Sequence, residues 1–83
     1  MEAPEWWGWE LRFIGHLEER MEERGFTEAD LRGMLEDGTD LSASRRHGRW
    51  LVSTRFRGKP WVVVVEPDPD EQITYVVTAY PRG

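Results

Sequence analysis

The hydrophobic period of this chain changes from 3.6 residues to 2 residues near Leu41, and this change constrains the fold more than any other feature of the sequence. Apolar residues before it recur at helical spacing, and apolar residues after it alternate with polar ones. With 83 residues, the chain has room for one domain with a small core. The pattern predicts a single α+β domain over residues 1–83, in which two N-terminal helices pack on one face of a three- to four-stranded antiparallel β-meander.

Two helices are predicted before the change of period. The first covers residues 9–24 and ends at Gly25, because glycine readily adopts the positive φ of a C-terminal cap. The second begins at Thr27, an N-cap residue followed by an acid at the third helical position, and it ends at Gly38. A Trp-rich lead-in, residues 1–8, precedes both helices. Its tryptophans either cap the core or mark an interface.

Three long strands and a short one are predicted after the change of period. The short one is an edge strand at residues 41–45, and residues 49–56 alternate as in a strand with one face in the core. Residues 61–65 are apolar throughout, as expected of a central strand. The last strand covers residues 72–79, and alternation divides its region into two faces: Ile73, Tyr75, Val77 and Ala79 on one, and Thr74, Val76, Thr78 and Tyr80 on the other.

Charge is distributed unevenly along the chain, within a net charge of −5. Residues 1–40 hold twelve acidic and four basic side chains, whereas residues 41–83 hold four acidic and seven basic ones. A net acidic chain argues against nonspecific nucleic-acid binding, but residues 42–60 contain six basic side chains and no acidic one. These cations are either solvated strand and turn residues or an RNA-binding surface. The predicted RNA-binding residues are Arg45, Arg46, Arg49 and Lys59.

The sequence disfavours several classes of site and location. It contains no cysteine, so disulfides, thiolate metal sites and cysteine nucleophiles are excluded. The acidic turn at residues 68–71 lacks the glycine and the distal acid of a calcium loop, so neither a metal site nor a cofactor is predicted. No apolar run reaches the length of a membrane span, and the acidic N-terminus lacks the basic start of a secretory signal. A cytoplasmic protein without a membrane partner is therefore expected.

One histidine and one arginine are expected to share an edge of the first helix. His16 and Arg20 are four residues apart, so they would stack on one face beside the apolar stripe. Metal-free RNA cleavage needs a base for the 2′-hydroxyl proton, an acid for the leaving 5′-oxygen, and guanidinium groups against the charge on the phosphorane. A histidine beside an apolar stripe is also commonly a packing residue. The residues of suitable type are His16, Arg20, Arg45, Arg46, His47, Arg49, Arg55, Thr78 and Tyr80.

Four sequence motifs carry a resemblance to a known group of proteins. They are H-x3-R-M-x2-R-G-F-T-x2-D-L, G-R-W, G-K-P-W-V-V-V-V-E and Y-V-V-T-A-Y-P. With them, residues 12–81 resemble small bacterial domains of unknown function grouped with the RelE/ParE-type toxins, and more widely the barnase and colicin nuclease folds. The resemblance implies a metal-independent endoribonuclease of toxin type. Its catalytic site would comprise a helix histidine, a basic strand residue and hydroxyl groups of the last strand, here His16 with Arg20, Arg55 or Arg49, and Thr78 with Tyr80.

The resemblance also implies partners, and two other functions remain open. The implied partners are RNA, including ribosome-bound mRNA or tRNA, and a cognate antitoxin or inhibitor protein. Alternatively, a noncatalytic RelE-like module would bind a protein partner, or itself as a homodimer, through the Trp-rich N-terminus and a sheet edge. An inhibitor that mimics nucleic acid would use the acidic helix face of Glu18, Glu19 and Glu22.

Overall fold

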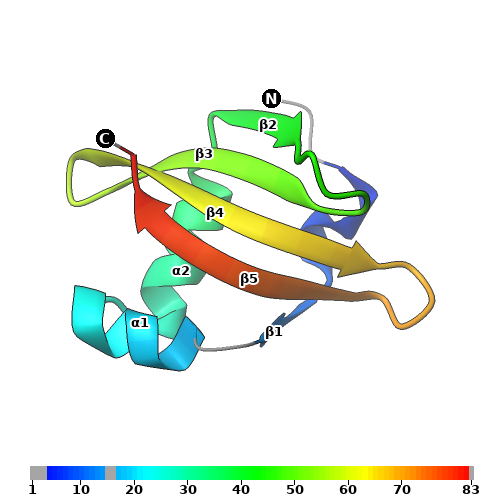
Figure 1. Cartoon of the computed structure of the whole chain (residues 1–83), viewed down its shortest axis with the longest axis horizontal. Helices are drawn as coiled ribbons and strands as arrows, with labels where there is room; N and C mark the ends of the chain where they lie inside the picture. Colours follow the sequence, from blue (N-terminus) through cyan, green and yellow to red (C-terminus); the bar gives the residue numbers. More distant parts are fainter. Residues whose placement is uncertain (1–3, 15–16, 83) are drawn as a thin grey trace.

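The computed structural model describes residues 4–14 and 17–82. In chain order its elements are the 3₁₀ helix η1 (Glu5–Gly8), β1 (Glu10–Phe13), α1 (Leu17–Arg24), α2 (Glu28–Glu36), β2 (Asp40–Ala43), β3 (Trp50–Phe56), β4 (Lys59–Asp68) and β5 (Ile73–Pro81). The five strands form one sheet in the order β1-β5-β4-β3-β2 (Figure 1). Strands β2 to β5 pair antiparallel, whereas β1 runs parallel to β5.

The predicted fold class is therefore wrong in two respects. The sheet is mixed and five-stranded rather than a three- to four-stranded antiparallel meander, and a strand precedes the helices, so the helices are not N-terminal. The first half of the predicted helix at residues 9–24 is a strand, in which Leu11 and Phe13 alternate with Glu10 and Arg12. Arg12 Nε donates to Glu10 Oε2 at 3.1 Å. Residues two apart share a face in a strand but not in a helix, so this contact belongs to β1.

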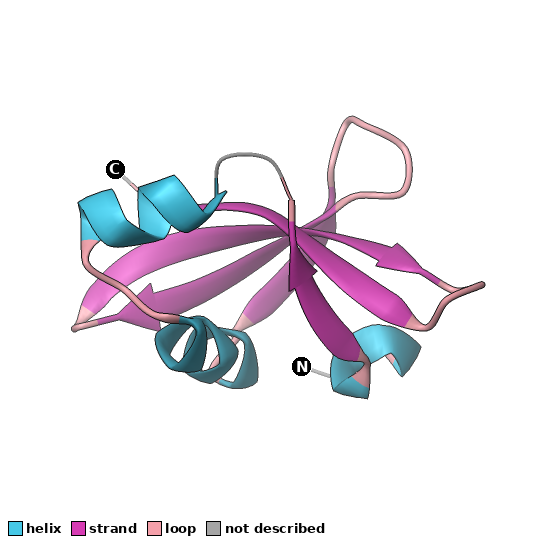
Figure 2. Ribbon diagram, turned by 90° about the horizontal axis from the view of Figure 1, so that it is seen from below, coloured by secondary structure: helices cyan, strands magenta, loops and turns pink. Residues whose placement is uncertain are grey.

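Helix α2 covers one face of the sheet, α1 lies beside the edge of β5, and both helices contribute to the core. In Figure 1, α2 passes behind β3 and β4, and Figure 2 shows it to one side of the strands. Helix α1 contacts β5, and α2 contacts β3. Because successive side chains of a strand point to opposite faces, every second residue of the sheet points toward this core and contributes to it. The buried cluster comprises Leu17, Met21, Phe26, Leu31, Met34 and Leu35 from the helices and their junction, and Val52, Trp61, Val63, Val65, Val76 and Ala79 from the sheet.

The junction between the helices forms as its sequence predicts. Gly25 has φ of +72°, the Gly25 N–H donates to Glu22 O at 3.3 Å, and the Phe26 N–H donates to Met21 O at 3.0 Å. This pair of bonds is a Schellman motif, which satisfies the last carbonyls of α1. Helix α2 begins with a capping box between Thr27 and Asp30.

Two glycine-to-alanine substitutions in this helical layer are expected to have opposite effects on stability. Gly25→Ala should lower the free energy of unfolding by about 1 kcal/mol, because a Cβ disfavours the left-handed backbone. The nearest atom to that Cβ is Arg57 Nη1 at 3.8 Å, so the cost is conformational rather than steric. Gly33→Ala in α2 should raise stability by about 0.5–1 kcal/mol, since a Cβ there meets nothing within 4 Å. Urea denaturation measures both changes, and shifts in the same direction would contradict the backbone conformation assigned to one of the two glycines.

A β-bulge in β5 overturns the predicted division of that strand into two faces. Val64 pairs with Thr78 and Val65 pairs with Val76, so Val77 has no opposite residue on β4. One extra residue reverses the alternation beyond it. As a result, Ala79 lies on the same face as Thr74 and Val76, and Thr78 and Tyr80 lie on the opposite face together with Ile73 and Tyr75.

The edge of β5 beyond β1 is covered by side-chain and loop contacts. Strand β1 pairs with β5 only as far as Val76, whose carbonyl also accepts the Ile14 N–H at 3.2 Å. Farther along, Arg24 Nη1 of α1 donates to the Ala79 carbonyl. These contacts occupy backbone acceptors that an open edge would otherwise offer to another chain. In the described parts of the protein, no helix has the length and apolar character required to cross a membrane.

Candidate functional site on the open sheet face

The sheet face that points away from α1 and α2 carries three of the predicted catalytic residues. We call it the open face, because no described helix covers it. Register places Thr78 opposite Val64, Tyr80 opposite Val62, and Arg55 of β3 opposite Pro60. The structure therefore brings residues from β3 and β5 onto one surface, separated only by β4.

One end of the open face gathers two guanidinium groups and a phenol. Arg55 of β3 pairs with Pro60 of β4. On the other side of β4, the N–H of Arg82, the last described residue, donates to Pro60 O at 2.8 Å, so the three residues lie in one row across the sheet. Alternation from Tyr80 places Arg82 on the open face. Strands β3 and β5 are about 10 Å apart across β4, a gap that long side chains can span from both sides. Arg55, Arg82 and Tyr80 can therefore reach a common ligand above Pro60 and Val62.

The arginines at the other end of the open face form ion pairs, whereas those at this end have no carboxylate partner among the described residues. Arg12 pairs with Glu10 at 3.1 Å, and Arg49 pairs with Glu66 at 3.4 Å, both between Nε and a carboxylate oxygen. Within the described ranges, the side chains of Arg55 and Arg82 form neither an ion pair nor a hydrogen bond. Arg55 is exposed, so its guanidinium group is accessible to a ligand. Two oxygens of a phosphate group can accept two parallel hydrogen bonds from the planar guanidinium group of an arginine.

The other predicted site residues do not join this group. Arg20 is exposed on α1, in the helical layer. Arg45 and Arg46 lie in the exposed loop between β2 and β3, about 20 Å from Arg55 along the strand. Lys59 lies near Arg55 at the other tip of the sheet, but it pairs with Phe56, one residue farther along β3, and alternation places that pair on the helical face.

Two further predicted residues stand apart for different reasons. Arg49 is half-buried beside Glu66, so its charge is already partly neutralised. The prediction for His16 concerns a residue outside the described ranges, and its position relative to Arg20 stays a prediction.

Sequence reasoning missed three residues of the open face. Arg12 was assigned to a helix, but β1 places it in register with Tyr75. Tyr75 was assigned to the face of Ala79, and the bulge separates the two. Arg82 lies beyond the predicted end of the last strand, although its position two residues after Tyr80 was a usable signal of a shared face.

The chemistry available at this end is anion binding with a proton donor close by. Two guanidinium groups can hold phosphate oxygens, and the Tyr80 and Thr78 hydroxyls can donate or accept hydrogen bonds. Tyr80 is 37% exposed, so a ligand can reach its ring as well as its hydroxyl.

The acidic residues of the turn after β4 form hydrogen bonds within the turn, because Asp68 Oδ1 accepts the N–H groups of Asp70 and Glu71 at 3.0 and 3.3 Å. Over residues 4–14 and 17–82, no group of three or more acids or histidines is placed to hold a metal ion.

Comparison with known proteins assigns a family but no activity. No curated protein matches the chain, and no solved structure matches it either. One family model matches residues 13–81, a range that contains α1, α2 and the four strands β2 to β5. Because this match spans most of the sequence, the chain belongs to the family described as Domain of unknown function (DUF4258).

Proposed function

We propose that this protein is a metal-independent endoribonuclease of toxin type, which holds the scissile phosphate of RNA at the Arg55 end of the open face. The observation that carries the proposal is the shared position of Arg55, Thr78 and Tyr80 on that face, reached from two different strands. Free guanidinium groups beside hydroxyl groups form a site suited to a phosphodiester. The resemblance to RelE-type toxins supports the same reaction.

Each residue then has a definite task. A base removes the proton of the 2′-hydroxyl, the 2′-oxygen forms a bond to phosphorus, and the bond from phosphorus to the 5′-oxygen breaks. The leaving oxygen takes up a proton, and the products are a 2′,3′-cyclic phosphate and a 5′-hydroxyl. Arg55, joined by Arg82, offsets the charge that grows on the equatorial oxygens. Tyr80 and Thr78 orient the substrate, and the acid or base role is assigned to His16, which lies outside the described residues.

The charge distribution fits RNA on one face only. Residues 17–37, which include both helices, hold eight acidic and three basic side chains, and both helices contribute to the core, which lies on the side of the sheet opposite the open face. Phosphate is repelled there and attracted to the open face, where Arg55 and Arg82 are unpaired among the described residues. A net acidic protein would then engage RNA in one orientation. Ribosome-bound mRNA or tRNA in the cytoplasm is the proposed substrate.

Arg55→Ala is expected to reduce RNA cleavage at least about 100-fold, because one donor to a developing oxyanion typically contributes that much. Cleavage is measured as new 5′-hydroxyl ends, with single-stranded RNA alone and in a translation extract that contains ribosomes. Growth after induced expression in a bacterial host gives a second readout. Tyr80→Phe, which removes only the hydroxyl, should lower the rate while the fold is retained.

Arg32→Ala is the matched control, because Arg32 is an exposed arginine of α2 and its loss changes the net charge equally. This variant should cleave RNA as the wild type does. Undiminished cleavage by Arg55→Ala would refute the phosphate site. A wild type that neither cleaves RNA in either assay nor arrests growth would refute the nuclease function itself.

A further inference from the structure

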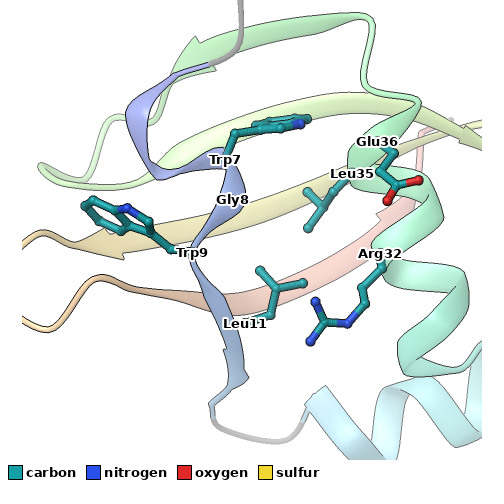
Figure 3. A pocket seen from close by; sticks show the side chains of 7 residues that line it. All are labelled: Trp7, Gly8, Trp9, Leu11, Arg32, Leu35 and Glu36. Atoms are coloured by element: carbon teal, nitrogen blue, oxygen red, sulfur yellow. The ribbon is translucent and has the colours of Figure 1, made fainter.

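A groove on the helical side of the sheet lies between the N-terminal segment and α2. Figure 3 shows η1 and β1 forming one wall and α2 the other. The groove has a volume of about 350 Å³. This is at the lower end of the range for ligand pockets, so the space fits one side-chain anchor better than a large ligand. Its lining residues are Trp7, Gly8, Trp9, Leu11, Arg32, Leu35 and Glu36.

The aromatic wall of the groove is fixed by packing. The Trp7 ring lies against Gly38, where an added Cβ would be 3.3 Å from Trp7 Cη2. The Trp6 ring lies beside it, tilted by 46°, at 5.4 Å between ring centroids, and the Trp6 carbonyl accepts the Thr74 hydroxyl at 3.3 Å. A wall held at these points is formed before a ligand arrives, which lowers the entropic cost of binding. In Figure 3 the Trp9 ring extends away from α2, which leaves Trp7, Leu11 and Leu35 as the apolar surface between the walls.

The charges at the rim select a cation. Arg32 Nη2 pairs with Glu28 Oε1 at 3.1 Å, so the basic residue of the lining already has a carboxylate partner. Glu36 forms no ion pair or hydrogen bond with any residue that the structure describes, and it is exposed at the end of α2. Residues 28–37, which form α2 and its C-cap, hold four acidic side chains and one basic one. An incoming cation therefore gains a carboxylate without breaking an existing pair.

From this combination we infer that the groove binds a basic side chain of a partner protein, a lysine or arginine in an otherwise apolar segment. The methylene stem would pack among Trp7, Leu11 and Leu35, and the charged head would pair with Glu36. Long cationic side chains bury their stems on apolar surface in this way, and a tryptophan face adds attraction for the cation. The groove lies on the face opposite the open face, so it is independent of the proposed RNA site.

A small probe with the same chemistry tests the groove directly. Isopentylguanidinium carries a branched apolar tail and a guanidinium head, 4-methylpentanoate carries a similar tail and a carboxylate, and guanidinium chloride has no tail. We expect the first to shift the indole N–H resonance of Trp7 in a saturable titration. A ligand of about nine heavy atoms should bind in the millimolar range. The carboxylate and the tailless cation should bind at least about threefold more weakly. Equal binding of the carboxylate, or no shift at Trp7, would overturn the inference.

Glu36→Gln removes the negative charge that is proposed to pair with the cationic head group, and it keeps the size of the side chain. It should weaken isopentylguanidinium about threefold or more, as expected for an exposed ion pair, and it should not unfold α2, because an acid at a helix C-terminus is unfavourable for the dipole. Asp37→Asn, next to it but outside the lining, should leave binding unchanged. Unchanged binding by Glu36→Gln would refute the assignment of the head group.

Two further measurements distinguish a foreign basic segment from a second copy of this chain and from RNA. If the occupant were a second copy, sedimentation would show a concentration-dependent dimer that Glu36→Lys abolishes, and the partner assignment would be overturned. RNA cleavage should be the same in Glu36→Gln as in the wild type, and isopentylguanidinium should bind equally well to Arg55→Ala. A protein without nuclease activity would thus still bind the probe, and a protein whose groove is inert would still cleave RNA.

Discussion

Trp61→Ala is expected to lower the free energy of unfolding by about 3–5 kcal/mol, the range observed when a large aromatic side chain is removed from a core. Trp61 of β4 is 6% exposed. Its ring contacts Phe26 at 5.4 Å and Phe56 at 5.5 Å between centroids, both edge to face. The substitution therefore removes buried area and two aromatic contacts together, at the point where the helix junction meets the sheet.

A loss of this size is a large part of the stability of a domain, which is commonly about 5–15 kcal/mol. Urea denaturation followed by far-UV circular dichroism measures it. Trp9→Ala is the matched control, since Trp9 is only partly buried and lies outside the core cluster. It should cost less than about 1 kcal/mol. Equal losses in the two variants would show that the aromatic cluster around Trp61 does not hold the helices on the sheet.

Deletion of Val77 is expected to be at least as damaging, with a loss of about 3 kcal/mol or more, or no cooperative unfolding at all. Val77 is the extra residue of the β5 bulge. Without it, strict alternation would turn Ala79 out of the core and direct Thr78 and Tyr80 toward the helices. The only alternative is to flip the first half of β5, which would expose Thr74 and Val76, both fully buried.

The matched control is deletion of Asp70, which lies in the exposed turn between β4 and β5 and belongs to neither strand. Turn tips tolerate changes of length far better than paired strands do. Both deletions are compared with the wild type by urea denaturation and by near-UV circular dichroism. A chain lacking Val77 that unfolds like the wild type would contradict the placement of the bulge.

The helix junction and the hairpin strands could be predicted from the sequence because their determinants are local. Gly25 ends α1, and Thr27 with Asp30 begins α2, through contacts within a few residues. The alternation of β3 was predicted correctly as well, with Val52 and Thr54 buried. Arg55 consequently lies on the opposite face, as β3 alternation requires.

The grouping of residues on the open face could be predicted in part. Chemistry and resemblance selected Arg55, Thr78 and Tyr80, and the structure places these three on one face. The same reasoning grouped Arg45 and Arg46 with Lys59, which lie at opposite ends of β3. Residue type indicates what a side chain can do, but the distance between two such side chains depends on strand pairing.

By itself, the sequence determined the change from helices to strands, the junction between the two helices and the faces of β3, since each depends on neighbours within a turn or a strand. Only the tertiary structure decided that Glu10–Phe13 forms a strand, because that segment satisfies either period and pairs with backbone groups of β5 more than sixty residues away in the chain. It also decided the faces of β5, because a bulge at Val77 leaves no local signal in a run of β-branched residues. The open face and the groove both depend on these two features, the pairing of β1 with β5 and the bulge in β5. Both are determined by how the sheet satisfies its backbone hydrogen bonds and buries its core.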